Sequence, residues 1–148
     1  MASELKRVLV GTDFSSTAAA ALTRGARLVR PSGGGLELMH VLSLRDAPDR
    51  GRDARRSNSR SIGPDAVSRM QVLAAETNAR FGVPVKVHLA FGAPHVELAA
   101  RAEVTDAGLL VIGAHGERVV WDMFIGRQNL RAPLVECGRR QCSNPGLS

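Results

Sequence analysis

Four short apolar runs, each about the length of a β-strand, recur along the chain with helical stretches between them. The runs lie at residues 7–10, 36–42, 85–91 and 109–112. Glycine, proline or polar residues bound each run, and the gaps between runs leave room for crossover helices. The resulting β-α-β-α-β-α-β order predicts an α/β fold, with a doubly wound parallel sheet in a three-layer arrangement.

Three helices are predicted between these strands. The first follows an N-cap at Ser15 or Ser16, because a serine hydroxyl can accept a hydrogen bond from an unpaired first-turn amide. The second begins at Pro64 and is ended by Gly82, and the third covers roughly residues 95–105. Each connects two strands, as the crossovers of a parallel sheet require.

Right-handed crossovers restrict the order of these strands in the sheet. If the first three wind outward and the fourth returns beside the first, the order is 3-2-1-4. Ligands of open α/β sheets bind outside the carboxyl ends of the strands where the winding reverses. Residues 11–13 and 113–116 follow the first and fourth strands, so we expect these distant loops to meet at one crevice.

Glycines in the second of these loops favour a binding role but leave an alternative open. A residue without a Cβ lets backbone amides approach a ligand, and amides that open a helix bind anions. The glycine spacing fits neither the P-loop nor the dinucleotide-binding fingerprint. A phosphate cradle and a plain turn therefore remain alternatives on these residues alone.

The net charge of +6 is concentrated in two segments of the 148-residue chain. Residues 45–60 hold six arginines and three aspartates, and residues 127–148 hold four arginines and one glutamate. The remainder is neutral, and only 3% of residues are aromatic. This distribution argues against a dedicated nucleic-acid surface, and nucleic-acid association through the two basic segments is the weakest of three functional hypotheses.

The hydropathy pattern predicts a single soluble domain in the cytoplasm, without membrane association. No apolar run approaches the length of a membrane span, and the amino terminus lacks signal-peptide anatomy. The two cysteines, Cys137 and Cys142, have no nearby histidine, so we expect two thiols in the tail and no metal site.

Four motifs together resemble the universal stress protein family over residues 5–126. They are RVLVGTDFSSTAAAAL, LMHVL, FGAP, and a G-x2-G-x9-G pattern at Gly113, Gly116 and Gly126. The resemblance implies strand order 3-2-1-4-5 and, usually, a homodimer that pairs through the fifth strand. It also implies a stress-response sensor or regulator that binds ATP or a related adenine nucleotide.

The family's binding positions map onto ten residues of this chain. They are Gly11, Thr12, Asp13, Val41, Ile112, Gly113, Gly116, Gly126, Arg127 and Gln128. By this resemblance, Asp13 contacts adenine or ribose, the backbone of Val41 faces the adenine edge, and Gly126 opens the phosphate-binding turn. Mg²⁺ would accompany ATP through phosphate and water ligands.

Structural alternatives stand beside several of these assignments. Asp13 is also suited to cap a helix or to interact with its dipole, and Val41 is suited to the core. His115 is expected at the rim of the site and Asp122 on the surface, neither of them catalytic. With no clear base and no lysine near the phosphates, the sequence predicts at most slow ATP hydrolysis.

Two features depart from the family pattern. Arg127 replaces the serine or threonine expected after the third glycine, so a phosphate-binding hydroxyl is exchanged for a long cation. Pro133 interrupts the helix expected in the tail, and the fifth strand is therefore missing, displaced to residues 132–137, or replaced.

These departures support a second functional hypothesis and a division of the chain. The second hypothesis is a stress-family interaction or dimerisation module that binds no nucleotide. The chain divides into an α/β domain at residues 1–126, with a basic flexible loop at 45–63, and an atypical tail at 127–148.

Overall fold

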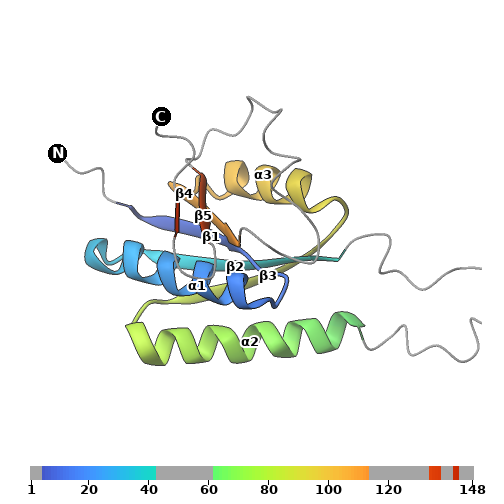
Figure 1. Cartoon of the computed structure of the whole chain (residues 1–148), viewed down its shortest axis with the longest axis horizontal. Helices are drawn as coiled ribbons and strands as arrows, with labels where there is room; N and C mark the ends of the chain where they lie inside the picture. Colours follow the sequence, from blue (N-terminus) through green and yellow to red (C-terminus); the bar gives the residue numbers. More distant parts are fainter. Residues whose placement is uncertain (1–4, 43–61, 114–133, 138–141, 144–148) are drawn as a thin grey trace, which may run out of the picture.

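The computed structural model describes residues 5–42, 62–113, 134–137 and 142–143. In chain order the elements are β1 (Arg7–Gly11), α1 (Ser16–Val29), the 3-10 helix η1 (Arg30–Ser32), β2 (Gly35–Leu42), α2 (Ile62–Phe81), β3 (Val85–Phe91), α3 (Pro94–Val104), β4 (Leu109–Gly113), β5 (Leu134–Cys137) and β6 (Cys142–Ser143). Figure 1 shows the sheet between two layers of helices, with α1 and α2 on one face and α3 on the other.

The strand order confirms the predicted doubly wound sheet. The described strands form one sheet in the order β3-β2-β1-β4-β5-β6. Neighbours from β3 to β5 are parallel, and β6 is antiparallel to β5. The winding of the sheet reverses between β1 and β4, as predicted.

The fifth strand lies at Leu134–Cys137, which agrees with the alternative of a strand displaced to residues 132–137. Leu110 of β4 is in register with Leu134, and Gly113 with Cys137. The sequence pattern gave no indication of β6, which pairs with β5 on the side away from β4. Cys137 and Cys142 are directly opposite in this antiparallel pair.

Helix α1 begins where the serine pair predicts and lies very close to β1. The hydroxyl of Ser15, the N-cap, accepts a hydrogen bond from the amide of Ala18 at 3.2 Å. A Cβ on Gly25 would lie 2.8 Å from a methyl carbon of Val10, so only glycine allows this approach of helix to strand. The close approach buries the apolar face of α1 against the sheet.

The starts of the second and third helices differ from the predictions by one or two residues, whereas β3 has the predicted bounds. The second helix begins at Ile62 rather than Pro64, and the third begins at Pro94 rather than His95. Proline suits the first helical position because its missing amide hydrogen would have no intrahelical partner there. After α2, Gly82 adopts φ +67°, and its amide donates to the carbonyl of Asn78 at 2.8 Å.

Alternation along the strands divides the core into two layers. In β1, Val8 and Val10 contribute to the layer under α1 and α2, whereas Leu9 contributes to the layer under α3. All three side chains are at most 1% exposed. Full burial of such side chains stabilises the fold by roughly 1.5–3 kcal/mol each.

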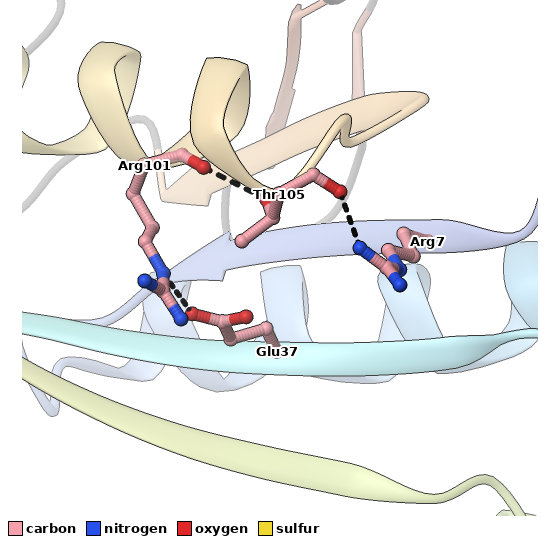
Figure 2. Close-up of polar contacts among 4 residues, drawn as sticks. All are labelled: Arg7, Glu37, Arg101 and Thr105. Carbon is pink, nitrogen blue, oxygen red and sulfur yellow. Dashed lines mark hydrogen bonds and ion pairs between the residues drawn. The ribbon is translucent and has the colours of Figure 1, made fainter.

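Polar contacts fix α3 to the sheet near the amino ends of the strands (Figure 2). The guanidinium of Arg101 in α3 lies 2.5 Å from a carboxylate oxygen of Glu37 in β2. A second arginine, Arg7 of β1, donates to the carbonyl of Thr105 at 2.8 Å. These contacts therefore lie at the opposite end of the sheet from the loops that follow β1 and β4.

Within the described ranges, no helix combines the length and apolar character that crossing a bilayer requires.

Candidate functional site

The carboxyl ends of β1, β2 and β4 lie side by side in the sheet. We call this region the carboxyl edge and define it as residues 11–13, Val41, Ile112 and Gly113. Gly11 is in register with Met39 of β2, and Val10 with Val111 of β4. The structure thus brings the ends of the first and fourth strands together at the switch point, as the topology argument predicts.

Two hydrogen bonds with residues of β2 hold the backbone of Thr12, the residue that follows β1. Its amide donates to the carbonyl of Met39 at 2.8 Å. Its carbonyl lies 2.7 Å from Nδ1 of His40, which must act as the donor because a carbonyl oxygen only accepts. The Thr12 hydroxyl accepts from the amide of Phe14 at 3.1 Å. These contacts define the turn that carries Asp13.

Asp13 is exposed at this turn and does not cap the helix. Its Oδ1 accepts a hydrogen bond from the amide of Ser15 at 2.9 Å, whereas Ser15 itself is the N-cap. The first turn of α1 contains no acidic residue. The alternative of Asp13 as the N-cap is therefore wrong, although its carboxylate lies beside the N-terminus of α1. Within the described parts of the chain, no hydrogen bond or ion pair engages its second carboxylate oxygen, Oδ2.

Gly11, Val41 and Ile112 belong to the face of the sheet that α3 covers. Ile112 is buried in the core layer beneath α3, and Val41 is half-buried against that layer. A Cβ on Gly11 would lie 3.3 Å from a methyl carbon of Ile112 and 3.1 Å from one of Leu98. Val41 therefore has a packing role, and its partial exposure leaves it accessible from the carboxyl edge.

Gly113 is in a position where the packing excludes a side chain. A Cβ there would lie 2.6 Å from Oγ1 of Thr17 and 2.8 Å from the amide nitrogen of Ala18. The end of β4 therefore approaches the first turn of α1 more closely than an alanine would permit. This contact is sufficient reason for glycine at residue 113, whether or not a ligand also approaches it.

The six described binding candidates, Gly11, Thr12, Asp13, Val41, Ile112 and Gly113, all lie at the carboxyl edge. The other four, Gly116, Gly126, Arg127 and Gln128, lie outside the described residues, as do His115, Asp122 and Pro133. Within the described parts of the chain, no three histidine, cysteine, aspartate or glutamate residues gather as a metal-binding group.

Next to the turn that carries Asp13 lies a cluster of three side chains that the sequence did not single out: Phe14, His40 and Arg69. The rings of Phe14 and His40 have centroids 4.6 Å apart, and the guanidinium carbon of Arg69 lies 4.1 Å from the Phe14 centroid. Phe14 also has a φ of 64°, in the left-handed region. The only sequence signal was the position of Phe14 and His40 directly beside the two predicted contacts, Asp13 and Val41.

Comparisons with solved structures agree with the observed fold. UspA from Lactobacillus plantarum is 16% identical with a TM-score of 0.70, covering 91% of this chain and 99% of that chain. The universal stress protein from Archaeoglobus fulgidus in complex with dAMP is 18% identical with a TM-score of 0.68, covering 91% and 99%. A universal stress protein in complex with cAMP is 18% identical with a TM-score of 0.60, covering 93% and 99%.

These likenesses support the fold, and the family follows from the sequence match. A search of curated proteins finds no match. The model of the universal stress protein family matches residues 4–128, which include β1 to β4 and the glycine motif. The chain therefore belongs to the universal stress protein family.

Proposed function

We propose that this protein binds ATP or a related adenine nucleotide at the carboxyl edge and acts as a stress-response sensor or regulator. The observation that carries the proposal is the turn after β1, which holds an exposed Asp13 carboxylate beside the ends of β2 and β4. Relatives with the same fold have been solved with dAMP and with cAMP. Both ligands are adenine nucleotides, which supports a site for that class.

The side chain of Asp13 supplies the polar contact to the nucleoside. With Oδ1 occupied by the Ser15 amide, Oδ2 is the oxygen that accepts a hydrogen bond from a ribose hydroxyl or from the adenine amino group. Hydrogen bonds to a charged acceptor are stronger than neutral ones. Val41, which is half-buried, provides apolar surface near the site, as small-molecule sites usually do, whereas Ile112 is buried in the core layer under α3.

The phosphates are assigned to the loop after β4. Gly116, Gly126, Arg127 and Gln128 follow Gly113, which lies against the first turn of α1. Backbone amides of a glycine-rich loop suit phosphate oxygens, and Arg127 can add a charge-assisted contact in place of the usual hydroxyl. Mg²⁺ would be held through the phosphates and water.

A regulatory role fits these residues better than rapid catalysis. Among the six described candidate residues, Asp13 has the one ionisable side chain, and no lysine or second carboxylate accompanies it. We therefore propose that ATP is retained as a signal and is hydrolysed slowly at most. The alternative of a module without nucleotide binding loses part of its basis, because β5 supplies the fifth strand.

Titration calorimetry of Asp13→Ala with ATP and Mg²⁺ tests this proposal. Loss of a charge-assisted hydrogen bond of about 1.5–3 kcal/mol should weaken binding by roughly 10- to 100-fold. Glu76→Ala is the matched control, because Glu76 is an exposed carboxylate on α2 and should bind as the wild type does. Gly113→Val is unsuitable, because its side chain would collide with α1.

Two results would contradict the proposal. One is a wild-type protein that shows no heat of binding at millimolar ATP and Mg²⁺. The other is equal affinity of Asp13→Ala and the wild type, which would place any bound nucleotide away from the carboxyl edge.

A further inference from the structure

We propose that His40 is a positioning residue for the nucleotide site: it holds the Thr12 carbonyl and thereby presents Asp13 to the ligand. This inference rests on the proposed function and extends it to a residue that does not itself contact the nucleotide. It is drawn from six contacts of the turn after β1, two of them within the turn and the others to β2 and α2.

The hydrogen bond from His40 is the side-chain contact that ties the turn to β2. The main-chain pairing of the two strands continues to Thr12, whose amide donates to Met39. Beyond this point the chain turns away toward the N-cap of α1 at Ser15. At this point the side chain of His40 supplies the next hydrogen bond between β2 and the turn, from Nδ1 to the Thr12 carbonyl at 2.7 Å.

This contact also determines how the imidazole is oriented. Because the Thr12 carbonyl can only accept, Nδ1 carries a hydrogen, and a neutral ring must be the Nδ1–H tautomer. The ring lies against Phe14, and Arg69 of α2 lies over the same phenyl ring. We call these three residues the ring stack. Packing of the ring stack limits the rotation that would break the hydrogen bond.

The turn needs such support because Phe14 is in an unfavourable backbone conformation. A φ of 64° brings the Cβ of a residue other than glycine close to backbone atoms. Such conformations persist only when the surroundings determine them. Here the Phe14 amide is bound by the Thr12 hydroxyl and the next amide, of Ser15, by Asp13.

The geometry of this turn decides where the Asp13 carboxylate points. Asp13 lies between Thr12, whose carbonyl His40 holds, and Phe14, which packs in the ring stack. A turn that is already ordered before binding spares the ligand the entropic cost of ordering it. Removal of the His40 donor should therefore weaken nucleotide binding although His40 remains outside the site.

Two substitutions separate the hydrogen bond from the ring contact. In His40→Asn the amide nitrogen occupies the same bonding position as Nδ1, so a donor is kept and the ring is lost. In His40→Phe the ring is kept and the donor is lost. We would titrate each variant with ATP and Mg²⁺ by calorimetry, and measure hydrogen exchange of the Ser15 amide without ligand.

The inference predicts opposite outcomes for the two variants. His40→Phe should bind ATP about 10-fold more weakly, as expected for one lost hydrogen bond, and should exchange the Ser15 amide faster. His40→Asn should remain within about 3-fold of the wild type in both measurements. Unchanged exchange of the Leu9 amide in β1 would show that the sheet is intact in both variants.

Failure of the inference can be distinguished from failure of the proposed function. If the wild type and His40→Phe bind ATP equally, the positioning role is overturned and the nucleotide site stands. If the wild type binds no ATP, the proposed function fails and the nucleotide role of His40 fails with it. Equal losses in His40→Asn and His40→Phe would also overturn the inference, since the donor would then be irrelevant.

Discussion

At the scale of single residues, the packing around Gly113 requires glycine independently of any ligand. The sequence motif assigns Gly113 to a phosphate-binding loop, and its packing would require glycine even without a ligand. A Cβ would meet Oγ1 of Thr17 at 2.6 Å and backbone atoms of α1 at under 3 Å. Because backbone atoms cannot move aside as a flexible side chain does, the collision must shift β4 or α1.

We therefore predict that Gly113→Ala destabilises the fold by about 1–3 kcal/mol, the usual cost of overpacking. Gly35→Ala is the matched control, since the nearest atom to its Cβ would be the Pro84 carbonyl oxygen at 3.7 Å. Its free energy of unfolding should lie within about 0.5 kcal/mol of the wild type. Urea denaturation measures both, and equal stabilities of the two variants would refute the packing argument.

Other residue contacts of the site could not be predicted from the sequence. The hydrogen bond from His40 to Thr12 spans 28 positions along the chain, and Arg69 reaches Phe14 from α2. Neither contact produces a periodic or local pattern. The positive φ of Phe14 is also invisible in sequence, because aromatic residues rarely adopt it.

At the scale of secondary structure elements, hydrophobic patterning predicted the strands β1 to β4 more firmly than β5. The four strands from β1 to β4 follow from their apolar runs, and Ser15 follows from capping chemistry. The predicted starts of α2 and α3 were less accurate, because proline is tolerated within the first helical turn: Pro64 is the third residue of α2 and Pro94 the first of α3. β5 was left among three alternatives because its four residues carry only a short apolar run.

The pairing of β6 with β5 has a consequence for assembly. β6 lies against the edge of β5 that faces away from β4. Subunits that pair through the fifth strand, as the family resemblance implies, require this edge to be free. An uncovered strand edge is a template for pairing with another chain.

We therefore predict that deletion of residues 138–148 increases self-association. The deletion removes β6 and leaves β5 at the edge of the sheet. Deletion of residues 144–148 alone is the control, because it retains Cys142–Ser143. Sedimentation velocity over a range of concentrations should show a larger species only for the longer deletion. A sedimentation profile shared by both deletions and the wild type would show that β6 does not control assembly.

At the scale of the whole molecule, the two ends of the sheet differ in the contacts and turns that they carry. Contacts between Arg101 and Glu37 and between Arg7 and Thr105 anchor α3 near the amino ends of the strands. The carboxyl edge carries the exposed turn with Asp13. This division is common in α/β proteins, in which the scaffold and the ligand site occupy opposite ends of the strands.

The sequence predicted this division because it depends on strand order alone. Right-handed crossovers restrict the order, and it is 3-2-1-4 if the fourth strand returns beside the first, as the family resemblance implies. This order places Gly11 and Gly113 at the same end of the sheet. Sequence could not predict which contacts make the edge rigid, since these depend on side-chain packing between elements. The fold was therefore more predictable than the details of the candidate site.

An NMR titration of the labelled protein with ATP and Mg²⁺ would locate the nucleotide on the sheet. We predict the largest amide shifts at Thr12, Asp13, Val41 and Gly113, with little change at Thr105, at the other end of the sheet. Shifts concentrated around Thr105, or none at millimolar nucleotide, would contradict an adenine nucleotide site at the carboxyl edge.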